Sequence, residues 1–241
     1  MLDQIKIVLS HTTHPGNIGA TARAMKVMGL NNLALVNPKM FPSAEATERA
    51  SKAADILSDA VVYDDIHDAL ADCRLIVGAS ARTRSLPSRL VTPRELVELV
   101  RTKTSNLPLA ILFGTESSGL TNEELHLCHY QVYIPTNPEY SSLNLASAVQ
   151  LISYEMRLAF SEMKQLPTQR VNESEQPVSR EQFDGLLAHF DSAMLKTGYI
   201  NPKHRKDIDI RMNRLLSKAQ ITQSEYRVLR GFLSAIENSI N

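Results

Sequence analysis

The chain has 241 residues, equal numbers of basic and acidic side chains, and a hydrophobic content of 43%. This length allows one large domain or a domain with a smaller module, and the zero net charge gives no hint of a polyanionic partner. No apolar run reaches the roughly 20 residues of a membrane span, and no signal-peptide pattern is present, so we expect a cytoplasmic protein without a membrane contact. With no Trp and 5% aromatic residues, a broad aromatic platform for single-stranded nucleic acid is not predicted.

The first 163 residues alternate between apolar strands and helices. Strands are predicted at 5–10, 33–37, 61–63, 75–79, 109–113 and 131–135. Helices are predicted at 16–28, 44–57, 66–70, 93–103 and 143–163, and Thr121 begins a capping-box pattern with Glu124. The strands are apolar throughout, which is typical of a parallel sheet covered by helices on both faces.

The C-terminal third of the chain has a different pattern. Residues 164–178 are polar and predict a linker, and residues 179–241 predict a small all-helical module that Ser179 begins as a helix cap. From Lys196 to Arg230 the chain has nine basic residues and three acidic ones, concentrated in a predicted loop at 199–206. This excess is typical either of a solvated helix face or of a surface that contacts phosphates.

The cysteines and histidines do not form a metal-binding pattern. Cys73 and Cys128 lie in separate segments, where reduced thiols are expected and one disulfide is the alternative. His11 and His14 are three residues apart, but no further Cys or His cluster completes a zinc site. We therefore expect no metal.

Polar loops follow several of the apolar strands, and a parallel sheet gathers such loops along one edge, where ligands bind. In the first loop, Gly16 and Gly19 would let the backbone approach a ligand at the start of a helix. Asn17 is either a ligand contact or a helix cap. Arg23 either holds a phosphate or is an ordinary surface arginine.

Two further loops contain candidate ligand residues. Glu116 lies between Gly114 and Gly119, after a buried strand. Its carboxylate is predicted to accept from a ligand hydroxyl, to pair with Arg23, or to cap backbone N–H groups in a turn. In the loop 137–144, the side chains with both a capping and a ligand-binding interpretation are those of Ser141, Ser142 and Asn144.

Together these loops resemble the three motifs of the SpoU branch of the SPOUT methyltransferases. The first motif matches residues 17–23, the second matches 113–120, and the third matches Ile134, Pro135 and 142–144 before a helix. Their order and spacing fit across residues 1 to about 160. The resemblance implies a parallel α/β sheet with a deep C-terminal trefoil knot, and a homodimer with its site near the subunit interface.

The resemblance also implies a cofactor and its pocket. S-adenosylmethionine would bind in the knot, in a pocket lined by Ala79, Ser80, Ala81, Gly114, Ile134, Ser141, Ser142 and Leu143. The implied catalytic positions are Arg23, Asn17, Glu116, Ser142 and Asn144. Arg23 matches the family's essential arginine, but a guanidinium stays protonated in proteins and is a poor general base. Its implied role is to orient the ribose and its phosphate, and the proton acceptor is a phosphate oxygen, water or another side chain.

Three features are similar to the members that methylate the 2′-oxygen of nucleotide 32, a cytidine or uridine, in the tRNA anticodon loop. They are the segments 119–125 and 137–146 and the helical C-terminal module. This implies a methyltransferase domain at 1–163, a linker at 164–178 and an RNA-binding module at 179–241, with the tRNA anticodon stem-loop as partner.

Other functions remain open at this point. The alternatives are 2′-O-methylation of another RNA such as rRNA, and a non-catalytic RNA-binding protein on the same fold. A dinucleotide-binding enzyme is disfavoured, because the G-x-G-x-x-G pattern is absent. One departure from the family is that Thr115, Ser117 and Ser118 replace basic or apolar residues, so this loop offers fewer cationic contacts to RNA.

Overall fold

The computed structural model describes residues 2–80, 89–103, 108–163, 173–200 and 205–240. The chain forms two compact units, residues 1–167 and residues 168–241. Within the described residues, no helix combines the length and the apolar character that a membrane crossing needs.

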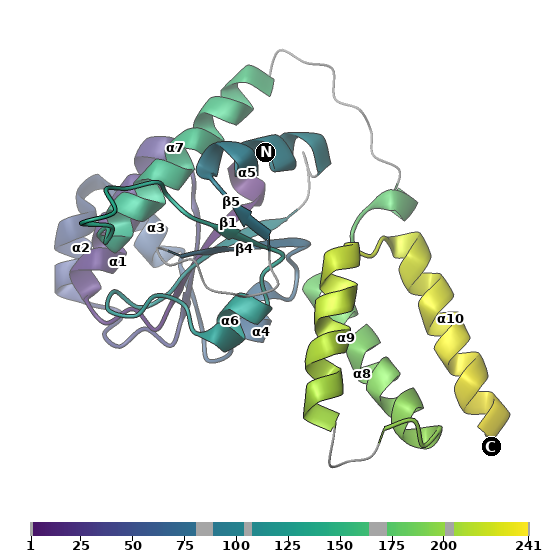
Figure 1. The fold of residues 1–241 in the computed structure, drawn as a ribbon. Coiled ribbons are helices and arrows are strands. Elements are labelled where there is room, and N and C mark those ends of the chain that lie inside the picture. Colours follow the sequence, from purple (N-terminus) through teal and green to yellow (C-terminus); the bar gives the residue numbers. More distant parts are fainter. Residues whose placement is uncertain (1, 81–88, 104–107, 164–172, 201–204, 241) are drawn as a thin grey trace. The chain divides into compact units, whose positions relative to one another are not determined.

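A fully parallel sheet forms the centre of the first unit (Figure 1). In the described residues it has seven strands in the order β3-β2-β1-β6-β4-β7-β5. They are β1 (Ile5–Ser10), β2 (Asn32–Val36), β3 (Val61–Tyr63), β4 (Leu75–Ala79), β5 (Arg89–Val91), β6 (Leu109–Phe113) and β7 (Tyr130–Val132). The predicted parallel sheet is confirmed. Strand β5 was not predicted, because its three residues are too few to show a periodic pattern, and β7 is shorter than the predicted strand at 131–135.

Helices cover both faces of this sheet. They are α1 (Pro15–Met28), α2 (Ala44–Ala50), α3 (Ala54–Ser58), α4 (Ile66–Leu70), α5 (Pro93–Lys103), α6 (Asn122–His126) and α7 (Leu145–Met163), with short 3-10 turns η1 (Leu2–Gln4) and η2 (Ser51–Ala53). The single helix predicted at 44–57 is wrong. It is interrupted at Ser51, whose φ of 53° lies in the left-handed region that an α-helix cannot contain.

The alternation of side chains along the strands divides the core into two layers. In β1, Ile5, Ile7 and Leu9 pack in the layer that holds the buried side chains of α1, α2, α3, α5 and α7. Val8 faces the other layer, with buried residues of α4 and α6. Cys73 and Cys128 are buried in this second layer as free thiols, so the expected reduced state is confirmed and the alternative disulfide is not formed.

Three α-helices form the described part of the second unit, α8 (Arg180–Lys196), α9 (Arg205–Ala219) and α10 (Gln223–Ile240), preceded by the turn η3 (Glu173–Glu175). Ser179 begins α8 with a capping box, in which its side chain accepts from the N–H of Gln182 and the Gln182 side chain accepts from the N–H of Ser179. The helices enclose a core of Val178, Phe183, Leu186, Ala193, Leu216, Ile221 and Leu233. The predicted loop at 199–206 is shorter than expected, because Arg205 and Lys206 begin α9, and residues 201–204 lie outside the described residues.

Candidate active site

A pocket of about 230 Å³ opens where the carboxyl ends of three neighbouring strands, β6, β4 and β7, meet. This is the edge at which parallel sheets bind ligands. Its lining comes from the ends of these strands and from the two loops that follow β6 and β7. The lining residues are Ala79, Ser80, Phe113, Gly114, Thr115, Glu116, Ser117, Ser118, Gly119, Leu120, Val132, Ile134, Ser141, Ser142, Leu143, Leu145 and Ala148.

Most residues predicted to bind a cofactor line this one pocket. They are Ala79, Ser80, Gly114, Ile134, Ser141, Ser142 and Leu143, whereas Ala81 lies outside the described residues. No cofactor contact was predicted for four apolar lining residues, Phe113, Leu120, Val132 and Leu145. Phe113 and Leu120 are the ends of the second motif, and Val132 and Leu145 lie in the strand and the helix predicted beside the third, so their place next to the motif loops was the available signal.

Glu116 connects the loop after β6 to the loop after β1. Its Oε2 accepts from the backbone N and the Oγ1 of Thr13, at 3.1 and 2.8 Å. Its Oε1 accepts from the backbone N of His14 at 3.1 Å and from Nδ2 of Asn17 at 2.9 Å. Of the three predicted interpretations, the carboxylate thus caps backbone N–H groups, but in a neighbouring loop. These described partners do not include Arg23, so the predicted Glu116–Arg23 ion pair is wrong.

These donors keep the Glu116 carboxyl group ionised. Burial by itself would raise its pKa, but the hydrogen bonds from Asn17 and Thr13 outweigh burial and lower the pKa to about 2. A carboxylate with such a pKa does not hold a proton at neutral pH. Its chemistry in this site is therefore that of a fixed hydrogen-bond acceptor.

The network continues from Asn17 to the third loop. Asn144 donates from Nδ2 to Oδ1 of Asn17 at 3.0 Å, and its own Oδ1 accepts from the backbone N of Ala146 at 2.9 Å. Because α7 begins at Leu145, Asn144 is the cap of this helix. Asn17 is not a cap, since α1 begins after His14. One chain of hydrogen bonds thus joins the loops after β1, β6 and β7.

The glycines of these loops have packing roles. A Cβ on Gly19 would lie 2.0 Å from the backbone O of Ala46, so this position permits close contact between α1 and α2. A Cβ on Gly114 would lie 2.1 Å from the backbone C of Gly119, across the turn that Thr115 and Gly119 close with two backbone hydrogen bonds. Gly19 therefore packs against the backbone of α2, and not against a ligand as predicted.

Arg23 lies outside this network. It is exposed on α1, six residues or about 9 Å along the axis beyond Asn17. Its side chain forms no hydrogen bond or ion pair with the described residues, and it is not among the residues that line the pocket. The guanidinium is therefore available to a partner from outside this unit.

Family models match both units. The model of the SpoU rRNA Methylase family matches residues 4–154, and that of the tRNA methyltransferase TrmJ C-terminal domain matches residues 181–241. The tRNA (cytidine/uridine-2'-O-)-methyltransferase TrmJ of Cronobacter sakazakii is 44% identical over 242 residues, which covers 100% of this chain and 99% of that protein. The chain belongs to the TrmJ family of SpoU methylases.

Solved structures agree with the TrmJ family. The crystal structure of TrmJ from Z. mobilis ZM4 superimposes with a TM-score of 0.82 at 32% identity, covering 96% of this chain and 98% of that chain. The SpoU methyltransferase AviRb from Streptomyces viridochromogenes, in complex with the cofactor AdoMet, has a TM-score of 0.52 at 23% identity. It covers 65% of this chain and 60% of that chain, and at this identity the likeness shows the fold alone.

SpoU methylases use S-adenosylmethionine, and the pocket of this TrmJ-family chain fits that group. Apolar side chains of Leu120, Val132, Ile134 and Leu143 suit the faces of an adenine ring, and Ser80, Ser141 and Ser142 offer hydroxyls near backbone polar groups for a ribose. The described residues contain no cluster of three or more His, Cys, Asp or Glu side chains that could hold a metal ion.

Proposed function

We propose that this chain transfers the methyl group of S-adenosylmethionine to the ribose 2′-oxygen of a cytidine or uridine at position 32 of the tRNA anticodon loop. The tRNA 2′-O-methyltransferase activity follows from the TrmJ family, since the relative with 44% identity over the full chain is named for it. The observation that carries the proposal is the hydrogen-bond chain Glu116–Asn17–Asn144, which fixes the three motif loops around one pocket. Since tRNA is used in the cytoplasm, where proteins are synthesised, we place the reaction there.

In this reaction the sulfonium–methyl bond breaks, a methyl–oxygen bond forms, and the 2′-hydroxyl loses its proton. The sulfonium of the bound cofactor supplies the reactive methyl group. The contribution of the protein is therefore alignment of the 2′-oxygen with that methyl group and exclusion of water. We assign cofactor contacts to the lining residues Ser80, Gly114, Ile134, Ser141, Ser142 and Leu143.

The polar network has a positioning role in this proposal. Glu116 is not the proton acceptor, because four donors occupy its two oxygens and its pKa is about 2. Instead it holds the start of α1 at the pocket, and Asn144 holds the start of α7 through Asn17. The proton passes to a phosphate oxygen, to water or to another side chain.

Arg23 contacts the RNA in this proposal. A guanidinium binds a phosphate in bidentate fashion and stabilises negative charge that develops on a nearby oxygen. Its exposure and the lack of described partners leave it free for this contact. Here Arg23 orients the nucleotide and favours alkoxide character on the 2′-oxygen.

The test is methyl transfer from labelled S-adenosylmethionine to total tRNA, followed by mapping of the modified nucleotide. We expect incorporation at the 2′-oxygen of pyrimidine 32, and a loss of about 100-fold or more in kcat/KM in Arg23→Ala with unchanged cofactor binding. Arg74→Ala, which changes an arginine outside the site, is the control. No label in tRNA with protein that is folded and binds the cofactor, or label at another nucleotide, would refute the assignment.

The second unit is the RNA-binding module in this proposal. On α9, Arg211, Arg214 and Lys218 are exposed at i, i+3 and i+7, so they form one stripe about 10 Å long. None of the three has an ion-pair or hydrogen-bond partner among the described residues. The opposite side of α9 packs Met212 and Leu216 into the core of the unit. A stripe of unpaired cations on the exposed side of a helix suits a phosphate backbone.

The α9 stripe is tested by the triple variant R211Q/R214Q/K218Q. We expect at least 10-fold weaker tRNA binding at about 0.1 M salt. The salt dependence of binding should also be shallower, because fewer counterions are released from the RNA when fewer phosphates are contacted. Cofactor binding should not change. The control is the exposed pair Glu225→Gln and Asn238→Ala on α10. Unchanged tRNA affinity in the triple variant would show that the cationic side chains of α9 do not bind tRNA.

Two further properties complete the proposal, the trefoil knot and the homodimer. The knot is supported by the insertion of β7 between β4 and β5, after which the chain continues into α7 against α1 and α5. When the unfolded chain is pulled from its ends with optical tweezers, we expect a contour shorter than that of the extended chain; a full contour would rule out a knot. The homodimer is supported by the exposed apolar side chains of Leu151, Tyr154 and Leu158 on α7.

A further inference from the structure

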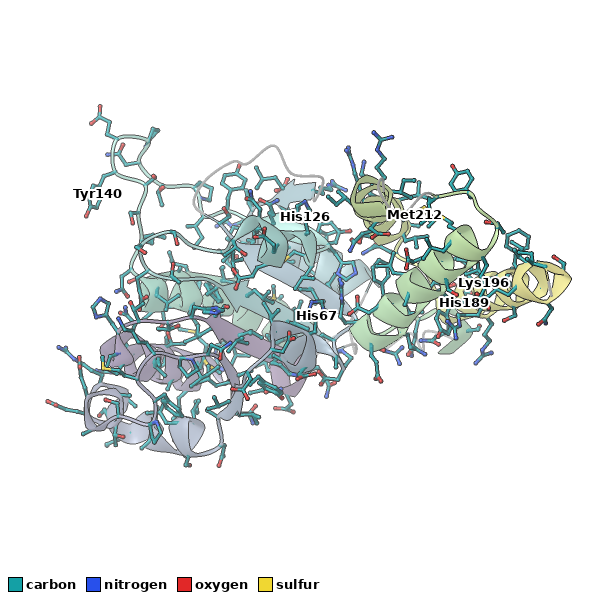
Figure 2. All side chains as sticks on the ribbon, turned by 90° about the horizontal axis from the view of Figure 1, so that it is seen from below. His67, His126, Tyr140, His189, Lys196 and Met212 are labelled. Carbon is teal, nitrogen blue, oxygen red and sulfur yellow. The ribbon has the colours of Figure 1, made fainter. Side chains whose placement is uncertain are left out.

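Tyr140 is a large apolar side chain that the fold leaves in solvent. Its side chain is 79% exposed, more than any other large hydrophobic residue in the described part of the chain. Figure 2 shows it at the tip of the loop between β7 and α7, pointing away from the body of the first unit. A single exposed ring is common on protein surfaces, so what favours a ligand is the place at which the chain holds this one.

The turn that presents Tyr140 is built by hydrogen bonds. Asn137 and Tyr140 form an antiparallel bridge, in which the backbone N of Tyr140 donates to the O of Asn137 at 3.0 Å. The side chain of Asn137 accepts from the backbone N of Glu139 at 3.0 Å, and Oγ1 of Thr136 donates to the O of Ser141 at 3.4 Å. The aromatic ring is therefore held on a defined turn.

This turn is also joined directly to the pocket. The three residues that follow Tyr140, namely Ser141, Ser142 and Leu143, all line the pocket, whereas Tyr140 does not. The ring is therefore carried by the residue directly before the pocket lining, on the solvent side. Leu143, which lines the pocket, is itself 38% exposed.

We propose that Tyr140 stacks on the base of the nucleotide whose ribose is methylated. This inference rests on the proposed function, because it requires a nucleotide of single-stranded RNA at the pocket. Proteins bind unstacked loop bases on tyrosine rings, and such stacking tolerates different bases because every base has a π-face. A stacking contact holds cytidine and uridine alike, which suits a site that accepts both pyrimidines.

The first experiment measures steady-state methylation of tRNA. We expect Tyr140→Ala to lower kcat/KM for tRNA about 10-fold or more, while Tyr140→Phe, which keeps the ring, stays within about twofold of the unchanged protein. The dissociation constant for S-adenosylmethionine should not change in either variant. Met40→Ala, which removes another exposed apolar side chain of the first unit, is the matched control.

The second experiment reports stacking without turnover. An anticodon stem-loop with the fluorescent base pyrrolo-cytidine at position 32 should be quenched when it binds the unchanged protein or Tyr140→Phe, and should stay bright with Tyr140→Ala. Equal quenching in all three proteins, or full kcat/KM in Tyr140→Ala, would overturn the proposal. Weaker S-adenosylmethionine binding in Tyr140→Ala would also overturn it, because the ring would then cover the cofactor. Because quenching needs no methyl transfer, it separates failure of the Tyr140 contact from failure of the proposed activity.

Discussion

Glu116 shows how one side chain organises the pocket. Four donors from Thr13, His14 and Asn17 surround its carboxylate and lower its pKa to about 2. Since this pKa lies below that of an unfolded glutamate, near 4.5, the stabilisation is fully present above about pH 4.5. It is lost as the pH falls toward 2.

We predict that Glu116→Gln lowers the free energy of unfolding at pH 7 by about 2 kcal/mol. One carboxylate oxygen would become an NH2 group, which cannot accept the hydrogen bonds of the donors around it. Between pH 5 and pH 3 the unchanged protein should lose more stability than Glu116→Gln. Urea denaturation at both pH values measures this difference. Glu139→Gln, on the neighbouring loop, is the control and should behave like the unchanged protein. If Glu116→Gln and the unchanged protein lost equal stability between pH 5 and pH 3, the carboxylate would not be hydrogen-bonded as described.

The residues of the site differ in how well the sequence predicted them. The motif positions around the pocket could be found because short motifs in a fixed order mark loops at strand ends. The partners of Glu116 could not be predicted from the sequence. Its hydrogen bonds join residues about 100 positions apart and depend on β1 lying beside β6. Arg23 was a plausible partner by charge, but two backbone N–H groups, a hydroxyl and an amide occupy the carboxylate instead.

At the scale of elements, the contact between α1 and α2 depends on Gly19. A Cβ at this position would lie 2.0 Å from the backbone O of Ala46 and 2.9 Å from Cβ of Arg49. Backbone atoms cannot yield as a flexible side chain does, so the two helices would have to separate. The start of α1 also holds Asn17, so a shift of this helix reaches the pocket.

We predict that Gly19→Ala destabilises the first unit by about 2 kcal/mol and weakens cofactor binding, because overpacking shifts α1. Thermal and urea unfolding, with cofactor titration, measure both effects. The contrasting control is Gly231→Ala in α10, where an added Cβ meets nothing within 4 Å, and which should gain about 1 kcal/mol from helix propensity. Normal stability of Gly19→Ala would contradict the close packing.

The elements themselves were largely predictable, because apolar strands of five or six residues and helices of 11 to 19 residues show clear patterns. The exceptions are instructive. The alanine-rich segment 44–57 has the composition of one helix, but a left-handed Ser51 divides it, and nothing in its composition signals that conformation. The order of the strands, with β7 between β4 and β5, also depends on long-range pairing that local patterns do not encode.

At the scale of the whole molecule, α7 has two apolar faces. One packs Val149, Ile152 and Met156 into the core of the first unit. The other exposes Leu151, Tyr154 and Leu158 by 43, 46 and 41%, at i, i+3 and i+7 along the helix. On α1, which packs against α7, Val27 is 62% exposed. A helix that is apolar on both sides lies between two packed bodies, and a second copy of the chain is the partner that we propose.

We predict that the double variant Leu151→Asp/Leu158→Asp is a folded monomer, since each carboxylate would be buried without a partner in the dimer. Sedimentation velocity measures the mass, and circular dichroism tests that the helices remain. We further propose that Arg23, one turn from Val27 on α1, acts at the pocket of the second copy, so the monomer should also lose methyl transfer. Val228→Asp/Phe232→Asp, a more exposed apolar pair on α10 at 70 and 60%, is the control and should stay dimeric. A Leu151→Asp/Leu158→Asp protein that remains a dimer, or an active monomer, would place the interface or Arg23 elsewhere.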